Sequence, residues 1–225
     1  FTYDIGTKVY FGEGEIKNLP AAIKECGHKV LLAYGGGSIK KNGLYDEATK
    51  LMRDNGIEWV ELSGIEPNPR HTTVNKGAQI CRDNGVDVVL AIGGGSTIDC
   101  AKAVAFATFY EGDAWDIVSR KAQPTKFLPV ISVLTLSATG SEMDTFGVIS
   151  NLETKDKIGF GFPESRPVSS ILDPTYTYSV NAYQTASGTA DIMSHTLETY
   201  FTKVTDAYLL DRVCEGILKT CIKYG

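Results

Sequence analysis

The tetrapeptide Gly-Gly-Gly-Ser occurs twice in this chain, at residues 35–38 and 93–96. Each copy follows an apolar run, at residues 30–34 and 86–92, and precedes a segment with helical spacing of apolar residues. A strand that ends in a glycine turn and opens into a helix suits phosphate, because the backbone comes close and free N–H groups point at the anion. Neither copy matches the G-x-G-x-x-G fingerprint, and neither carries the lysine of a P-loop. A single turn of this kind also occurs without a ligand, but two of them indicate a long ligand with several phosphates, most plausibly a dinucleotide.

Strand and helix patterns alternate along most of the chain. Strands are predicted at residues 29–34, 57–62, 86–92 and 129–134, and helices at residues 14–26, 43–55, 72–84 and 98–107. This alternation predicts an α/β fold with a mostly parallel sheet and helices on both faces. Residues 1–11 are typical of a strand or a hairpin arm at the edge of the sheet.

The strand signals stop at Asn181, and the rest of the chain has helical spacing, over residues 184–201 and 206–224. We therefore predict two domains, a dinucleotide-binding α/β domain at residues 1–178 and the first helices of an all-helical domain at residues 179–225. The last helix carries an apolar stripe that we expect to be buried. The stripe consists of Leu209, Leu210, Val213, Ile217, Leu218, Cys221 and Ile222.

Composition excludes several classes of function. The net charge of −5 argues against a nucleic-acid partner or an anionic membrane surface. No apolar run is long enough to span a bilayer, and the first residues do not resemble a signal peptide. The five cysteines are scattered without a Cys-x-x-Cys pair, which predicts reduced thiols and a cytoplasmic location. Because the chain begins at Phe1 and ends at Gly225 directly after an amphipathic stretch, we expect a piece of a longer protein.

Polar residues beside the two glycine turns bear on the choice of cofactor. NAD-binding proteins usually place an acidic residue at the adenosine 2′-hydroxyl, whereas Ser38, Lys40 and Lys41 follow the first turn here. A hydroxyl and two ammonium groups suit a 2′-phosphate, so NADP is predicted over NAD, although two solvated lysines would give the same pattern. Asp99 lies one turn into the second helix and would repel a phosphate that it faced. We expect it to bond to the backbone or a ribose, or to be a first-turn acid favoured by the helix dipole.

Asp191 and His195 lie four residues apart in a predicted helix, so their side chains leave the same face one turn apart. A carboxylate and an imidazole placed in this way can bind one divalent metal. An exposed helix pair or a core histidine explains the spacing equally well, and two protein ligands are too few for a stable site. Upstream, residues 135–142 form a Ser/Thr-rich segment after a buried strand, where open α/β sheets bind ligands.

Taken together, these segments resemble the iron-dependent (group III) alcohol dehydrogenases, and within them the butanol dehydrogenase-like branch. The resemblance extends over all 225 residues. The motifs that carry it lie at residues 35–41, 93–102, 138–142, 173–174 and 188–195.

The resemblance implies a role for each candidate site residue. The cofactor-binding set that it implies is Gly36, Gly37 and Ser38 at the adenosine ribose, Gly94, Gly95 and Ser96 at the pyrophosphate, Thr135 and Thr139 at the nicotinamide, and Lys157 as a further cofactor contact. The residues themselves add Lys41 and Asp99 to the predicted cofactor-binding set, as argued above. It also implies that Asp191 and His195 are the first two ligands of a metal held in the helical domain. Two departures are visible: Asn181 replaces a proline usual in the family, and no histidine follows His195, although the family supplies two more histidine ligands.

The function implied is reversible hydride transfer between NADP(H), with NAD possible, and a primary alcohol or aldehyde such as butanol. The metal expected is Fe²⁺, with Zn²⁺ possible, because a carboxylate ligand makes the site harder than a Cys/His zinc site. The family also implies a homodimer. Two alternatives stay open: a dehydroquinate synthase-like or glycerol dehydrogenase-like metal and NAD enzyme, and, for this chain alone, a cofactor-binding module without turnover.

Overall fold

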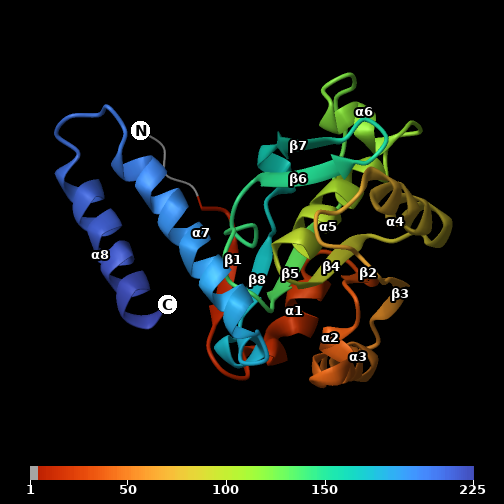
Figure 1. Cartoon of the computed structure of the whole chain (residues 1–225). Coiled ribbons are helices and arrows are strands. Elements are labelled where there is room, and N and C mark those ends of the chain that lie inside the picture. Colours follow the sequence, from red (N-terminus) through yellow and green to blue (C-terminus); the bar gives the residue numbers. More distant parts are fainter. Residues whose placement is uncertain (1–4) are drawn as a thin grey trace.

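A computed structural model describes residues 5–225, so residues 1–4 of the expected edge arm lie outside the described part. Six strands form one sheet in the order β1-β8-β5-β4-β2-β3, and every pairing in it is parallel (Figure 1). The strands are β1 (Lys8–Phe11), β2 (Lys29–Tyr34), β3 (Glu58–Leu62), β4 (Val88–Gly93), β5 (Val130–Leu134) and β8 (Ser169–Leu172). The predicted fold class, a mostly parallel sheet flanked by helices, is confirmed.

Helices cover both faces of the sheet. They are η1 (Glu15–Asn18), α1 (Leu19–Lys24), α2 (Ser38–Lys41), α3 (Leu44–Asp54), α4 (His71–Asn84), α5 (Gly95–Ala107) and α6 (Ala114–Val118). Successive strand residues point to opposite faces, so Leu31 and Ala33 join the core cluster of α4 and α5, while Val30 and Leu32 join that of α1 and α3. The buried strands therefore have continuous apolar sequences with no alternation.

A two-stranded antiparallel hairpin, β6 (Phe146–Asn151) and β7 (Asp156–Gly161), lies beside α5 (Figure 1). This hairpin was not predicted from the sequence, because its turn at residues 152–155 lacks an Asn-Gly or Asp-Gly pair. Its burial depends on aromatic contacts with α5, where the Phe106 ring meets the Phe160 ring edge-on with 5.2 Å between centroids. Strand β8 was missed as well, because half of its four residues are serines.

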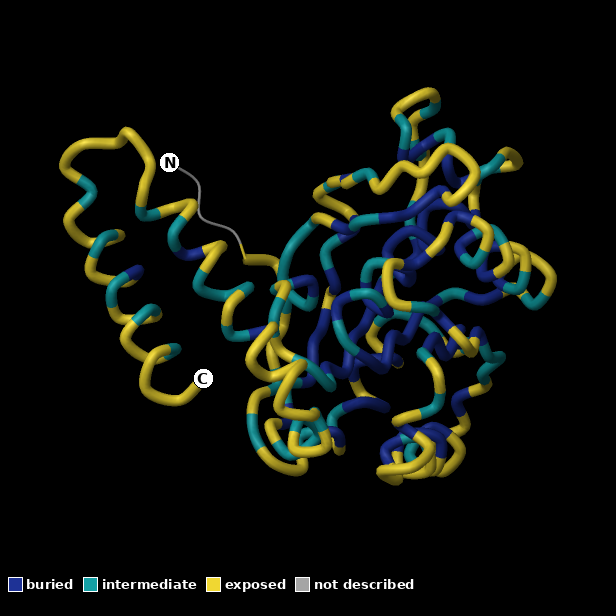
Figure 2. The backbone as a smooth tube through the Cα atoms, viewed as in Figure 1, coloured by how far each residue is buried: buried dark blue, intermediate teal, exposed yellow. Residues whose placement is uncertain are grey.

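After η2 (Pro163–Ser165), β8 and η3 (Pro174–Thr177), the chain ends in two helices, α7 (Ala182–Tyr200) and α8 (Tyr208–Tyr224), which lie side by side (Figure 1). Asn181 caps α7 by accepting a hydrogen bond of 2.9 Å from the Gln184 N–H. The expectation that the α8 stripe is buried is wrong for this chain, since Leu209 is 78% and Ile222 75% exposed. Most of the α8 backbone is coloured as exposed in Figure 2. Helix α8 packs mainly on α7. Because α7 covers only a narrow strip of the α8 surface, most of the apolar stripe stays exposed. No helix in the described part has both the length and the apolar character needed to cross a bilayer.

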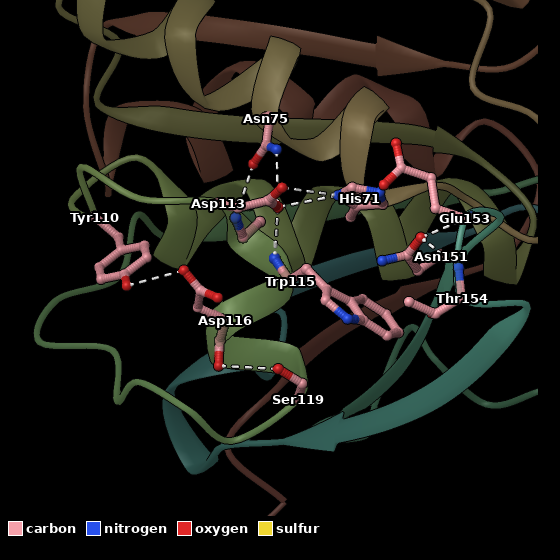
Figure 3. A network of polar contacts seen from close by, with 11 residues as sticks. His71, Asn75, Tyr110, Asp113, Trp115, Asp116, Ser119, Asn151, Glu153 and Thr154 are labelled. Atoms are coloured by element: carbon pink, nitrogen blue, oxygen red, sulfur yellow. Dashed lines mark hydrogen bonds and ion pairs between the residues drawn. The ribbon is translucent and has the colours of Figure 1, made fainter.

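A polar network around the buried His71 joins α4 to α6 (Figure 3). His71, the first residue of α4, is 7% exposed, and its Nδ1 lies 3.0 Å from Asp113 Oδ1. Asp113 caps α6 by accepting from the Trp115 N–H at 2.8 Å and also accepts from Asn75 at 2.9 Å. Burial raises the pKa of the Asp113 carboxyl, but hydrogen bonds from Trp115, Asn75 and His71 outweigh it and leave the pKa below its ordinary value.

We expect Asp113→Asn to destabilise the fold by about 1 kcal/mol at pH 7, because charge-assisted hydrogen bonds become neutral ones. A carboxyl whose pKa is lowered by folding stabilises the fold above its unfolded pKa, and this contribution is lost as the pH falls through the folded pKa. The difference between the wild type and the variant should therefore shrink towards zero between about pH 5 and pH 2. Urea unfolding across this range measures it. A difference that stays constant with pH contradicts the assignment.

Candidate dinucleotide and metal site

The two glycine turns lie side by side at the carboxyl edge of the sheet, because β2 and β4 are paired neighbours. The chain runs from β2 outward to β3 and then crosses to β4 on the other side of β2, so the connections after β2 and β4 leave on opposite faces. Open α/β sheets bind ligands at such a switch point. A cleft of about 390 Å³ is present there. Its lining residues are Gly35, Gly36, Ile65, Pro67, Gly94, Gly95, Ser96, Thr97, Leu136, Thr139 and Gln184.

The second turn provides the N-terminus of α5, a helix of 13 residues that no side chain caps. Its first N–H groups therefore stay available to an anion in the cleft. Gly95 must be a glycine, because a Cβ atom there would lie 2.5 Å from Thr139 Oγ1. Gly93 is restricted in the same way, because a Cβ atom there would lie 2.4 Å from Thr97 Oγ1. Packing against Thr139 and Thr97 therefore requires both glycines. The uncapped N–H groups at the start of α5, here named the glycine cradle, suit a pyrophosphate.

The first turn leads only into α2, a helix of four residues, so it offers no helix N-terminus comparable with that of α5. Lys40 of α2 lies over the rings of Tyr34 and Tyr45, with 5.0 and 4.4 Å from Nζ to the centroids. Both phenol groups donate to Glu61, at 2.6 and 2.5 Å. Both lysines are exposed, but within the described part of the chain Lys41 has no ring contact or ion pair of the kind that Lys40 makes. The two lysines therefore occupy different environments, which their adjacent positions in the sequence did not indicate.

Asp99 faces the protein interior. Its carboxylate accepts from Ser141 Oγ at 2.6 Å and from the Val148 N–H at 2.9 Å, so the expected backbone hydrogen bond is present. Burial raises the pKa of the Asp99 carboxyl against the effect of these hydrogen bonds. Thr139 lines the cleft, and the Thr135 N–H donates to the Gly93 carbonyl. Lys157 is an exposed residue of β7, and it is absent from the residues lining the cleft.

Helix α7 connects the predicted metal pair to this cleft. Gln184 lines the cleft, and a Cβ atom at Gly188 would lie 2.8 Å from the Ser137 carbonyl oxygen. Asp191 and His195 continue the same helix face, because the spacings of four, three and four residues follow the helical repeat. Their side chains are 42% and 57% exposed, with 3.7 Å from His195 Nε2 to Asp191 Oδ1.

A second cavity, of about 190 Å³, lies between α7 and the segment after β5 and shares Leu136 and Gln184 with the cleft. Neither Leu136 nor Gln184 was predicted as a site residue from the sequence. The position of Gln184 seven residues before Asp191 on the same helix was a signal for it, whereas nothing in the sequence singled out Leu136.

The described residues fit part of a metal site. They contain no group of three or more His, Cys, Asp or Glu side chains able to hold a metal ion, so Asp191 and His195 would supply two ligands. A carboxylate with an imidazole is a donor set that suits Fe²⁺ or Zn²⁺.

The site combines the cleft at the switch point, the glycine cradle and helix α7, which carries Asp191 and His195. Together with the parallel sheet, these features define the class of α/β proteins that have a sheet of the nucleotide-binding type. Residues 6–174 match the family model described as iron-containing alcohol dehydrogenase. The chain belongs to the iron-containing alcohol dehydrogenase family, as its motifs predicted.

Two relatives and one solved structure indicate the branch. The chain is 59% identical over 225 residues to NADH-dependent butanol dehydrogenase A of Clostridium acetobutylicum, a match covering 100% of this chain and 58% of that protein. It is 40% identical over 228 residues to NADPH-dependent aldehyde reductase YqhD of Escherichia coli, a match that also covers 100% of this chain and 58% of that protein. The crystal structure of NADH-dependent butanol dehydrogenase A from Thermotoga maritima superimposes with a TM-score of 0.95 at 42% identity. That match covers 99% of this chain and 56% of that structure's chain. The butanol dehydrogenase branch is confirmed, and the chain spans just over half the length of these relatives.

Proposed function

We propose that the protein containing this chain transfers hydride between a nicotinamide dinucleotide and a small primary alcohol or aldehyde. The observation that carries the proposal is the cleft at the switch point, which is lined by both glycine turns and bordered by the helix of Asp191 and His195. The names of the relatives, butanol dehydrogenase and aldehyde reductase, support the substrate class. In this proposal residues 1–178 form the dinucleotide-binding domain, and residues 179–225 are the first helices of a metal-binding helical domain.

Each part of the chain has a separate task in this proposal. The amides of Gly94, Gly95 and Ser96 bind the pyrophosphate at the start of α5. Gly36, Gly37 and Ser38 border the adenosine ribose, and Thr135 and Thr139 line the nicotinamide side. The protein thereby holds the nicotinamide and the substrate carbon in contact and excludes water. A divalent iron or zinc ion held by Asp191 and His195 supplies Lewis acidity towards the substrate oxygen when bound.

The proposal is tested with the whole protein, by following NADPH absorbance after butanol and NADP are mixed. Steady formation of NADPH supports hydride transfer to the free cofactor. A saturable change of fluorescence on titration with NADPH, without any turnover, indicates the cofactor-binding module instead. A dehydroquinate synthase-like lyase would release no reduced cofactor, and a glycerol dehydrogenase-like enzyme would prefer glycerol to butanol.

We further propose NADP(H) as the cofactor, with NAD(H) the alternative that the name of the Clostridium relative favours. Ser38 and the exposed Lys41 remain available to a 2′-phosphate, whereas Lys40 lies over two aromatic rings. Lys41→Ala should weaken NADPH binding about tenfold and change NADH binding by less than about twofold, because only NADPH carries the phosphate. Fluorescence titration of both cofactors measures this.

Lys40→Ala is the matched control for the neighbouring position. It removes the same charge from a residue engaged by Tyr34, Tyr45 and Glu61, so it should affect both cofactors equally. An equal loss of both cofactors in Lys41→Ala contradicts the role of Lys41.

We also propose a homodimer in the cytoplasm. Among the described residues 5–225, strand β1 is an edge strand paired only with β8, and its Phe11 is 73% exposed, which supports pairing with a second copy. All five cysteines are free, which supports a reducing compartment.

A further inference from the structure

Lys102 is a charged side chain with no exposed surface. It lies in α5, three residues after Asp99 on the same helix face, and it has no part in the proposed cofactor and metal sites. Its Nζ donates to Asp144 Oδ1 at 2.7 Å and to the Phe146 carbonyl oxygen at 2.7 Å. Burial lowers the pKa of the Lys102 ammonium, and the Asp144 carboxylate opposes that effect. A buried ammonium persists only when such partners compensate its lost hydration.

The partners of Lys102 lie in the segment that follows β5 and ends at the first residue of β6, here named the closing segment (residues 135–146). Its first half contains Leu136 and Thr139, which line the dinucleotide cleft. Its second half is held on α5 at two points one helical turn apart, by Asp99 through Ser141 and by Lys102 through Asp144. The cleft-lining residues therefore belong to a loop whose far end is attached to α5, the helix that begins at the second glycine turn.

We propose that Lys102 is a positioning residue, which holds the closing segment so that Leu136 and Thr139 border the second glycine turn. Thr139 packs so closely on Gly95 that a small outward movement of the segment would open this side of the cleft. The identity of the bound molecule rests on the proposed function. The attachment of the segment to α5 rests only on the hydrogen bonds that Asp99 and Lys102 make with it.

The ion pair is asymmetric, and this asymmetry directs the choice of variant. Lys102 is completely buried, whereas the Asp144 side chain is 38% exposed. Removing the ammonium leaves a carboxylate that water can solvate, while removing the carboxylate leaves a buried cation without its partner. Lys102→Met keeps most of the side-chain volume and is therefore the first variant.

The experiment compares Lys102→Met with Arg82→Met in the whole protein. Arg82 donates to the carbonyl oxygens of Ala107 and Thr108, so it secures the opposite end of the same helix, away from the cleft. Lys102→Met should weaken NADPH binding about tenfold by fluorescence titration and speed amide hydrogen exchange in residues 139–146 about tenfold. Arg82→Met should lower the melting temperature and leave both quantities within about twofold of the wild type.

Unchanged exchange in residues 139–146 of Lys102→Met overturns the inference, and so does an equal loss of affinity in both variants. If the wild type binds neither NADPH nor NADH, the proposed function fails, and the exchange rates alone decide the role of Lys102. Should Lys102→Met not fold, Asp144→Asn at the half-exposed position is measured in the same way. Faster exchange in residues 139–146 of that variant supports the inference, and wild-type exchange overturns it.

Discussion

Gly95→Ala should reduce affinity for NADPH by at least about 100-fold, equivalent to about 2.7 kcal/mol. The new Cβ atom would lie 2.5 Å from Thr139 Oγ1 and 3.0 Å from Thr139 Cγ2, so either α5 or the closing segment must move. Either movement displaces the N–H groups at the start of α5 from the position that suits a pyrophosphate. Fluorescence titration of the whole protein with NADPH measures the loss, and circular dichroism verifies that the variant is folded.

Gly216→Ala is the matched control. Gly216 lies within α8, and an added Cβ atom there has no neighbour within 4 Å. This variant should gain about 0.5 to 1 kcal/mol of stability and keep its affinity for NADPH. Binding by Gly95→Ala within about threefold of the wild type would contradict the assignment of the cradle.

Asp191→Asn and His195→Ala should each lower the rate of butanol oxidation by at least about 1,000-fold while NADPH affinity stays within about threefold. Both side chains lie on the α7 face that continues from Gln184 and Gly188, beyond the residues that line the cleft. Loss of either ligand should also lower the bound metal, because the described residues contain no group of three or more ligating side chains. Steady-state rates and elemental analysis of the purified whole protein measure both effects.

Asp211→Asn, the same carboxylate-to-amide change on α8, serves as the control and should keep both activity and metal content. Near-wild-type oxidation by either α7 variant would exclude these residues as metal ligands. Parallel loss of NADPH binding and turnover would instead indicate a distorted α7, since Gly188 of this helix packs against the Ser137 carbonyl.

Much of the fold was predictable because it depends on local spacing. The four predicted strands and the helices between them lie within a few residues of their predicted bounds. The apolar runs are long enough to mark strands buried on both faces. Strands β6 and β7 were missed because no Asn-Gly or Asp-Gly turn marks their hairpin, and β8 because it has only four residues, two of them serines. The aromatic and serine contacts that hold these strands come from distant segments. The α8 stripe had a clear helical period, but a period identifies an apolar face without showing what covers it.

The candidate site was predictable to a similar degree. The two glycine turns and the spacing of Asp191 and His195 were visible in the sequence, and the pairing of β2 with β4 brings the turns together. The distinction between Lys40 and Lys41 was not visible, because it depends on two tyrosines and a glutamate that meet only in the folded chain.

The sequence by itself determined the α/β class, the positions of both glycine turns and the helix face shared by Asp191 and His195, because each follows from the residues of one short segment. Only the tertiary structure decided which side chains border the cleft and which are turned away from it. Lys102 and Asp144 are 42 residues apart, and their ion pair exists because the sheet brings α5 against the segment that leads into β6. Such contacts depend on how distant segments pack, and no local pattern in the chain encodes them.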